Sequence, residues 1–437
     1  MSRMRNKAEL KDSGLRGVGA IPIDWKVSRV RDLFDEITDR YHEGETYLPL
    51  LSVSEYYGVA PRKEKINEGD VLTRAATLDG YKKCMKGDIV SNIMLAWKGS
   101  LGRSPENGIV SPSYCVYRPR KNVNSRYYHY LFRTVAYQDT FRINSTGLIS
   151  SRLRLYTPKF YSIKVPYPSL LNQEVIVAYL DDHCARIDAL VDTAKASIKE
   201  YEILKQSIIY EAVTKGLNKS VEMKDSKNVW YGQIPVHWEI HKISWDYSVE
   251  LGKMLDQKRI KGIHLHPYLR NVDVRWDRIN FDNLAKMDFD DNELERYGVL
   301  PGDLMICEGG EIGKCNIIPD NFPNGIYYQK ALYRVRAYDM QKNNPAYLRY
   351  LITFLAKSGY LNDSVQKATI AHLPAEKLKQ LRVPVPPIKE QKMIVRYLDK
   401  RMDTFKNLRN EKESLISDLE AYKKSLIYEV VTGKREV

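Results

Sequence analysis

The 437-residue sequence lacks several features that define large classes of protein. No apolar run approaches the roughly 18 to 20 residues that a membrane-spanning helix needs, and the polar start MSRMRNKAEL has no signal-peptide core. The five cysteines are odd in number and show no CxxC spacing, which favours free thiols in a reducing compartment. We therefore expect a cytoplasmic protein whose fold does not depend on disulfide bonds.

A convincing reactive centre is also missing. The glycine-rich run Gly309–Lys314 is one residue shorter than a phosphate-binding loop and is not followed by the required Ser or Thr, so we expect a tight turn between strands. The histidine pairs His237/His241 and His264/His266 have no third ligand that would give a zinc geometry, which favours structural roles. We expect no catalytic residue, no metal and no cofactor in this chain.

The chain does carry a large positive charge. It has 69 basic and 55 acidic residues, which gives a net charge of +14, and its composition is otherwise that of a globular protein with two or three domains. An excess of this size favours polyanionic partners, meaning nucleic acid or an anionic membrane surface.

One unit of sequence occurs twice. Ile21–Trp25 (IPIDW) returns as Ile234–Trp238 (IPVHW), and each copy is followed by an alternating run that predicts a strand. Further motifs recur in the same order at offsets of about 211 to 220 residues. They are Gly87–Val90 with Gly302–Met305, Gly99–Arg103 with Gly310–Lys314, Tyr117–Arg120 with Tyr333–Arg336, and Val165–Pro168 with Val383–Pro386.

The last part of the repeat aligns without a gap. Positions 165–214 share about 19 of 50 residues with positions 383–432, so the chain is a tandem duplication of a variable domain and a constant segment. The predicted divisions are an N-terminal extension (1–20), a first variable domain (21–169), a first helix (170–216), a linker (217–233), a second variable domain (234–387) and a second helix with a C-terminal tail (388–437).

Each constant segment predicts a long helix with a heptad seam. From Phe405 the apolar positions step by three and four, interrupted only by Lys412, and the first copy has the same steps. About 40 residues at about 1.5 Å each give roughly 60 Å, which is longer than a domain of this size is wide. The residues expected to pair the helices are Ile187, Leu190, Ala194, Tyr201, Leu204, Ile208, Phe405, Leu408, Leu415, Leu419, Tyr422 and Leu426.

These patterns predict an α+β protein. Two mixed α/β domains stand in tandem, each followed by a long helix, and the helices pair as an antiparallel coiled coil with pseudo-two-fold symmetry. The alternative is that each helix packs only on its own domain. The predicted helices (174–214 and 390–430) carry −4 and +1, which leaves +17 for the rest of the chain, so the charge that attracts polyanions belongs to the domains.

The duplicated motifs resemble a known family. The run Trp230–Glu239 (WYGQIPVHWE), the Gly-Asp and Gly-x-Ile/Leu-Gly-Lys/Arg arrangement, and helix ends reading SIIYEAVTKG and SLIYEVVTGK are similar to specificity subunits of type I restriction-modification enzymes. The resemblance covers about residues 22 to 433, and one departure is Thr146-Gly147 where the second copy has Gln366-Lys367.

The resemblance implies a non-catalytic subunit whose two target-recognition domains each read one half of an interrupted double-stranded DNA sequence. It also implies that the helices set the spacer and dock two methyltransferase subunits that carry S-adenosylmethionine, and that restriction subunits using ATP and magnesium join the complex. A non-DNA-binding helical scaffold for protein partners is the alternative. The candidate DNA contacts are Arg74, Lys98, Arg103, Ser145, Thr146, Arg152 and Arg154 in the first domain, and Lys253, Arg275, Lys314, Gln366, Lys367 and His372 in the second.

Overall fold

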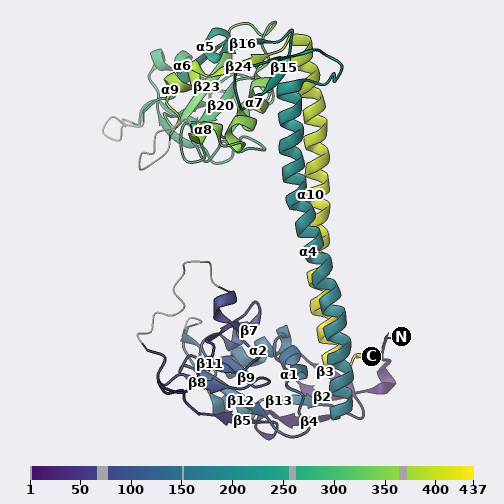
Figure 1. Cartoon of the computed structure of the whole chain (residues 1–437). Coiled ribbons are helices and arrows are strands. Elements are labelled where there is room, and N and C mark those ends of the chain that lie inside the picture. Colours follow the sequence, from purple (N-terminus) through teal and green to yellow (C-terminus); the bar gives the residue numbers. More distant parts are fainter. Residues whose placement is uncertain (1, 66–76, 150–151, 255–261, 364–371) are drawn as a thin grey trace. The chain divides into compact units, whose positions relative to one another are not determined.

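The chain folds as two units, and each unit combines one variable domain with parts of both long helices (Figure 1). The computed structural model describes residues 2–65, 77–149, 152–254, 262–363 and 372–437. Unit 1 comprises Met1–Lys195 and Glu413–Val437, and unit 2 comprises Ala196–Lys412. The two predicted helices are confirmed as α4 (Leu170–Lys215) and α10 (Ile388–Val431).

The variable domain of unit 1 is built on a four-stranded antiparallel sheet in the order β10-β9-β12-β5. Helices α1 to α3 pack their aromatic side chains into the core beside this sheet. The alternating run after Trp25 forms β4 (Lys26–Arg29), as predicted, and β4 pairs with β13 (Lys164–Tyr167), the strand that leads into α4. The bounds are β5 (Phe34–Ile37), β9 (Ile89–Asn92), β10 (Leu101–Arg103), β12 (Tyr114–Pro119), α1 (Ser125–Phe132), α2 (Val135–Asn144) and α3 (Thr157–Ser162). Two-stranded pairs complete the domain: β6 (Leu51–Ser54) with β7 (Gly58–Pro61), and β8 (Lys82–Cys84) with β11 (Gly108–Val110).

The variable domain of unit 2 repeats this sheet. Its strand order β21-β20-β23-β17 matches the order β10-β9-β12-β5 of unit 1 strand for strand. Strand β16 pairs with β24 as β4 pairs with β13. The bounds are β16 (Glu239–Lys242), β17 (Tyr247–Leu251), β20 (Leu304–Cys307), β21 (Cys315–Ile317), β23 (Leu332–Ala337), β24 (Arg382–Val385), α5 (Ile243–Asp246), α6 (Asp291–Tyr297), α7 (Pro345–Lys357), α8 (Tyr360–Asp363) and α9 (Ala375–Gln380). A second sheet joins β18 (Leu265–Leu269), β19 (Ala285–Asp288) and β22 (Tyr327–Tyr328).

The strand registers correct two of the motif pairings. Tyr117 lies opposite Ile89, whereas Val335 lies opposite Leu304, the counterpart of Ile89. Tyr117 therefore corresponds to Val335 and not to Tyr333, so the Tyr-Arg motifs were aligned two residues out of register. The ion pairs agree, because Arg118 binds Asp88 at 3.0 Å and Arg336 binds Asp303 at 2.6 Å.

The glycine motifs are out of register by three residues. The backbone N–H groups of Asn92 and Cys307 donate to the carbonyls of Ser100 and Lys314, so these last two residues are equivalent. Gly99 therefore corresponds to Gly313, both with positive φ, rather than to Gly310. The predicted tight turn between strands is confirmed, because Gly309–Lys314 connects the antiparallel strands β20 and β21.

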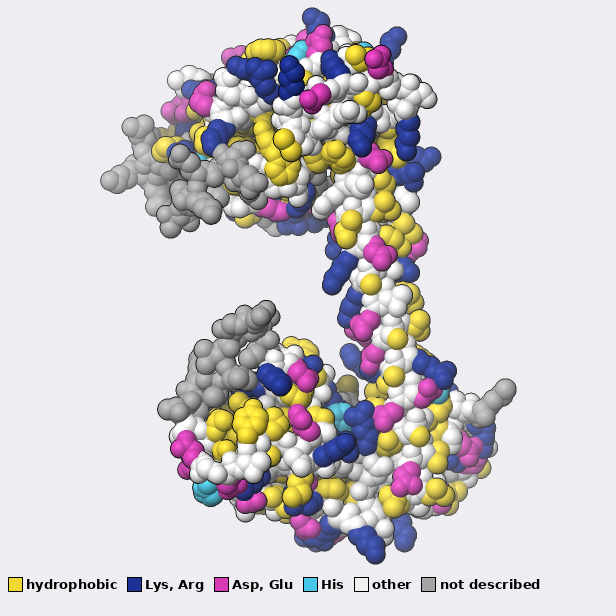
Figure 2. Space-filling model, viewed as in Figure 1, with side chains coloured by type: hydrophobic (Ala, Val, Ile, Leu, Met, Phe, Trp, Pro, Cys, Tyr) yellow, Lys and Arg dark blue, Asp and Glu magenta, His cyan; other side chains and the backbone are white. Residues whose placement is uncertain are grey.

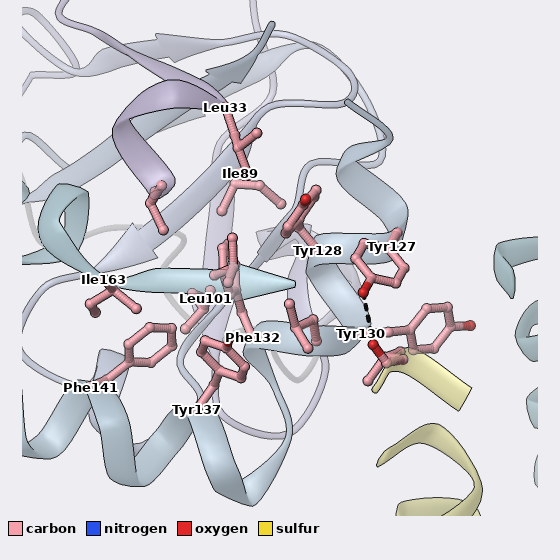
Figure 3. Packing of buried hydrophobic residues seen from close by; sticks show 14 of the residues in the cluster. Leu33, Ile89, Leu101, Tyr127, Tyr128, Tyr130, Phe132, Tyr137, Phe141 and Ile163 are labelled. Carbon is pink, nitrogen blue, oxygen red and sulfur yellow. Dashed lines mark hydrogen bonds between the residues drawn. The ribbon is translucent and has the colours of Figure 1, made fainter. Parts of the chain in front are cut away.

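The core of unit 1 is aromatic and includes the end of α10. Tyr127, Tyr128, Phe132, Tyr137 and Phe141 of α1 and α2 pack together in the interior (Figure 3). Leu426, Val430 and Val431 join the same cluster, and the Tyr127 hydroxyl donates to the Val431 carbonyl at 2.8 Å.

Unit 2 has the equivalent arrangement with the end of α4. Ile209, Ala212 and Val213 belong to its core, and the Tyr347 hydroxyl donates to the Val213 carbonyl at 3.1 Å. The last turn of α10 therefore lies in the hydrophobic core of unit 1, and the last turn of α4 lies in that of unit 2.

The two helices run antiparallel within each unit. In unit 1, Lys423 of α10 binds Asp188 of α4 at 2.6 Å. In unit 2, the rings of Tyr201 and Phe405 lie 6.3 Å apart, with Arg409 and Glu202 at 3.8 Å beside them. In unit 1 the first half of α4 thus contacts the second half of α10, and in unit 2 the second half of α4 contacts the first half of α10.

The predicted seam is correct at every seventh position and, with the exception of Leu408, wrong between them. Ile187 and Ala194 are buried as expected, but Leu190 is 56% exposed and the seam position is taken by Val191. The same error applies to Leu204, Leu415 and Tyr422, which are exposed, whereas Ile208, Phe405, Leu408 and Leu419 are partly buried and Leu426 is fully buried. At Leu190, Leu204, Leu415 and Tyr422 the more buried seam position is instead the next residue along the helix, because the seam steps by four and then by three there.

Residues 1–20 were expected as an extension, but residues 2–20 are folded into unit 1. Strand β1 (Arg3–Met4) pairs with β25 (Arg435–Glu436), and an ion pair of 2.7 Å between Arg3 and Glu436 reinforces the pairing. Strands β2 (Leu10–Leu15) and β3 (Gly19–Pro22) form a hairpin, and β14 (Met223–Asp225) and β15 (Gln233–Pro235) form the corresponding pair in unit 2.

All five cysteines are free and buried. Burial raises the pKa of the Cys84 thiol to about 11 and that of the Cys307 and Cys315 thiols to about 12, so these thiols stay protonated at neutral pH. Across the described residues, helices long and apolar enough to cross a membrane are absent, as are groups of three potential metal ligands.

A buried glutamine attaches each domain to its helix. Gln391 accepts a hydrogen bond from the Asn344 N–H at 2.8 Å and donates to the carbonyls of Lys342 at 3.1 Å and Pro386 at 2.8 Å. Gln173 makes the equivalent bonds in unit 1, and both side chains are almost completely buried.

We predict that Gln391→Ala destabilises the chain. The substitution leaves one buried N–H and two carbonyls without a partner, and each such group costs about 1 to 3 kcal/mol. Urea unfolding of the purified protein followed by tryptophan fluorescence measures the loss. The exposed Gln341→Ala is the matched control, and equal stability of the two variants would contradict the assignment.

Candidate nucleic-acid interface

Basic side chains are scattered in groups over the visible surface of both units, among acidic and hydrophobic ones (Figure 2). In unit 1 several of the predicted contacts gather around Trp97. The Lys98 ammonium lies 5.3 Å from the centroid of the indole ring, and the guanidinium of Arg142 on α2 lies 5.7 Å from it. Ser145 follows at the end of α2, where its hydroxyl donates to the Phe141 carbonyl at 2.7 Å.

The next predicted residues close a loop. Thr146 and Arg154 exchange two backbone hydrogen bonds of 2.9 Å, which bring the two ends of the loop together. Arg152 is exposed between these two ends. After the loop, the Leu155 N–H donates to the carbonyl of Ile93, which is four residues before Trp97 in the sequence. Ser145, Thr146 and Arg154 thus lie close together, and Lys98 packs beside α2, the helix that leads to them.

Arg103 lies apart from this group. It is half-buried on β10, and its backbone N–H donates to the His129 Nδ1 at 3.1 Å. Burial and the neighbouring guanidinium of Arg126 lower the pKa of Arg103, while Arg126 itself is held by Asp181 at 2.9 Å. The surroundings of Arg103 are therefore those of the junction between the domain and α4.

Unit 2 assembles a similar cluster from three loops. The Lys314 ammonium donates to the Asn271 Oδ1 at 3.2 Å, and the Asn271 amide donates to the Gly309 carbonyl at 2.7 Å. His372 forms a bridge with Gly309, and Arg275 is exposed on the loop that follows Asn271. Three of the predicted contacts thus share one part of the surface.

Lys253 is engaged inside its own domain. Its ammonium donates to the Asp288 carbonyl at 2.8 Å and pairs with Glu293, and it lies 5.2 Å from the Phe289 ring. Burial raises the pKa of Glu293, but the hydrogen bonds from Lys253 and from the Asp290 N–H, together with the positive charges of Lys253 and Arg296, outweigh burial and lower the pKa. The remaining predicted contacts, Arg74, Gln366 and Lys367, lie outside the described residues.

The predicted structural roles of two histidines agree with their contacts. His237 binds Glu390 at 3.0 Å, and His241 lies between Asp246 at 2.7 Å and Glu239 at 2.8 Å. Burial lowers the pKa of His241, but its hydrogen bonds to the two carboxylates outweigh this and the pKa is raised.

The aromatic members of both clusters, Trp97 and Trp276, were not predicted from the sequence. In unit 2, Lys357 lies 4.2 Å from the Trp276 ring, and both side chains bind Glu311, at 3.0 and 2.6 Å. The Trp97-Lys98 dipeptide of unit 1 was a visible signal. The Trp276 group was not, because its members come from three distant segments.

Comparison with known proteins identifies the family. The sequence model of the type I restriction modification DNA specificity domain matches residues 22–200 and 292–416. The chain belongs to this family of DNA specificity subunits. It is therefore a specificity subunit of a type I restriction-modification system and not a catalytic one.

Relatives of the specificity subunit span nearly its whole length. It is 24% identical over 446 residues to the MjaVIII specificity subunit of Methanocaldococcus jannaschii, covering 95% of this chain and 94% of the relative. It is 23% identical over 405 residues to the EcoKI specificity subunit of Escherichia coli, covering 87% and 82%.

Solved structures share the fold of the specificity subunit. A chain from a study of complex assembly and conformational transition of a type I restriction-modification system has a TM-score of 0.71 at 16% identity, covering 95% of this chain and 99% of that one. The HsdS subunit from Thermoanaerobacter tengcongensis has a TM-score of 0.59 at 17% identity, covering 96% and 99%. The predicted tandem of two mixed domains, each followed by a long helix, is confirmed.

Proposed function

We propose that this specificity subunit reads an interrupted, two-part sequence of double-stranded DNA, one half with each variable domain. The observation that carries the proposal is that two domains with the same strand order present different side chains at equivalent loop positions. Arg154 in unit 1 corresponds to His372 in unit 2, and Lys314 in unit 2 takes the place of the buried Ser100. Equal scaffolds with unequal loops suit two half-sites of different sequence.

The loop clusters supply the side chains that such a reader needs. Lysine and arginine neutralise phosphates and read guanine, whereas serine, threonine and histidine hydrogen-bond to base edges in the major groove. The first cluster offers Lys98, Arg142, Thr146 and Arg152, and the second offers Lys314. Lys253 is the weakest of the predicted contacts because Asp288 and Glu293 already occupy its ammonium.

Partners would carry the chemistry. We propose that methyltransferase subunits, two in the complete complex, hold S-adenosylmethionine and flip the target adenine, and that restriction subunits use ATP and magnesium. The specificity subunit itself would need no cofactor and would act in the cytoplasm, where its DNA substrate is.

The apolar residues left outside the helix seam are candidates for methyltransferase docking. Leu190, Leu415 and Tyr422 are each 43% to 56% exposed in unit 1, and Ile203 and Leu204 are 70% and 51% exposed in unit 2. Contiguous patches of large apolar side chains on a protein surface mark sites of protein–protein interaction.

We predict that Leu415→Asp weakens assembly with the methyltransferase subunit without unfolding the chain. A charge at an apolar contact leaves a carboxylate to be desolvated on binding, which should lower the affinity at least tenfold. Isothermal titration of the purified subunits measures it. Ser414→Asp, its neighbour on the same helix, is the control, and equal affinity for both variants would rule out this surface.

We predict that Lys98→Ala and Arg142→Ala weaken DNA binding uniformly. Each loses about one phosphate contact, so the slope of log affinity against log salt should fall by about 0.9 per substitution while sequence preference is kept. Fluorescence anisotropy with a mixed-sequence duplex measures the slope, with Lys424→Ala on α10 as control. A wild-type chain whose binding does not depend on salt would instead support a protein-binding scaffold.

We predict that lengthening both helices by matched insertions of one turn changes the gap between the half-sites and leaves their sequences intact. The helices would set the distance, whereas the loops would read the bases. Sequencing of methylation in DNA from cells that hold the variant and its partner subunits gives both quantities. An altered half-site sequence would refute this division of roles.

A further inference from the structure

The β6–β7 hairpin of unit 1 ends in a turn that exposes an aromatic side chain. Tyr56 is 84% exposed at this turn, and Tyr57 beside it is 38% exposed. The Tyr57 hydroxyl bonds to the Ser52 hydroxyl at 2.8 Å, and the Lys65 ammonium lies 5.3 Å from the Tyr57 ring. Tyr57 is thus fixed by its neighbours, whereas Tyr56 faces solvent.

A single arginine holds the backbone of this turn. The Arg133 guanidinium, at the end of α1, donates to the carbonyls of Ser54 at 3.3 Å and of Glu55 and Tyr56 at 3.0 Å each. It also donates to the carbonyls of Gly99 at 2.9 Å and Leu101 at 3.1 Å. Arg133 therefore joins the Tyr56 turn to the segment that follows Lys98.

Burying the charged Arg133 guanidinium costs free energy, which indicates that the turn it binds must be held in place. Burial lowers the pKa of Arg133, and among the described residues no carboxylate forms an ion pair with it. Removing a guanidinium from water is expensive unless its N–H groups are bonded, and here backbone carbonyls take that role. A solvent-exposed turn with no task would not need such an anchor.

Two glycines bring the hairpin directly against β10. A Cβ on Gly102 would lie 3.1 Å from the Gly58 Cα and 3.0 Å from the His129 Nδ1, so any side chain there would push the hairpin away. Gly58 has a φ of +80°, which favours glycine. The Ser100 hydroxyl adds a hydrogen bond of 3.1 Å to the Val53 carbonyl.

Among the described residues, the second domain has no arginine at the position of this anchor. The hydroxyls of Tyr130 and Tyr350 bind Asp181 and Asp399 at 2.5 Å, which makes these tyrosines equivalent and places Thr353 at the position of Arg133. The Thr353 hydroxyl donates to the Arg349 carbonyl in its own helix. A feature present in only one of two copies serves what differs between them, which is the half-site that each reads.

We propose that Tyr56 contacts a base edge in the first half-site and that Arg133 is its positioning residue. The proposal rests on the function proposed above. A tyrosine offers a hydroxyl that donates to or accepts from a base edge and a ring that packs on a thymine methyl group, and its two side-chain torsions cost little entropy to fix. Arg133 contributes by fixing the turn and by placing a positive charge behind it, toward which phosphates are attracted.

The test uses the chain assembled with its methyltransferase subunits, a random duplex library and S-adenosylmethionine. Sequencing of the methylated duplexes gives both half-sites for each variant. Tyr56→Ala should reduce discrimination at one or two adjacent positions of one half-site by about 5- to 150-fold, the contribution of a base contact. Arg133→Met should relax the same positions, and the other half-site should not change.

The control is Tyr47→Ala, because Tyr47 is 77% exposed in the same domain but makes no hydrogen bond with Arg133. It should leave both half-sites intact. An unchanged motif with Tyr56→Ala, or a uniform loss of affinity without a change of motif, would overturn the proposal. Because Tyr56 is a surface residue, its variant tests the contact even if Arg133→Met fails to fold. A wild-type chain that yields no two-part motif would instead refute the proposed function.

Discussion

Neither copy of the repeat can complete its own hydrophobic core. The core of unit 1 needs Leu426, Val430 and Val431 from the second repeat, and that of unit 2 needs Ile209, Ala212 and Val213 from the first. Two buried tyrosine hydroxyls, of Tyr127 and Tyr347, bond to carbonyls in these helix ends. A separated repeat would expose its half of these contacts to water. The duplication is therefore a structural requirement as well as a means of reading two sites.

The constant residues and the variable residues have different tasks. Gln173 and Gln391 use every polar atom of their amides to attach a domain to a helix, and such buried, fully bonded groups tolerate little change. The loops differ more between the two copies, because Arg154 and His372 occupy the same position with different chemistry. One scaffold can thus accept many loops, as long as an anchor such as Arg133 fixes those that must be rigid.

Much of the fold could be predicted from the sequence because a duplication supplies its own internal comparison. The helices and the strands that follow Trp25 and Trp238 recur with strong local patterns. The seam was partly wrong because Lys423 lies on it, half-buried, with its aliphatic stem in the interface, so the apolar pattern alone favoured Tyr422. At Leu415 the next residue, Ile416, is equally apolar, so the pattern did not distinguish the two.

The candidate site was less predictable, for reasons of distance and register. Short glycine and arginine motifs can be aligned two or three residues out of register, and only strand pairing showed that Lys314 corresponds to Ser100 rather than to Arg103. The acceptors of Lys253 lie 35 and 40 residues away along the chain, and the carbonyls that Arg133 binds lie 32 to 79 residues away. No local pattern reports contacts of this range.

The pairing of β1 with β25 has a consequence for synthesis on the ribosome. All of unit 2 is contiguous, so it can fold once residue 412 has emerged. The domain translated first must wait, with its aromatic core incomplete, until residues 413–437 have been synthesised. Unit 2 can therefore fold before unit 1 during synthesis. A chain whose translation stops early would expose the hydrophobic core of unit 1, which chaperones and proteases recognise.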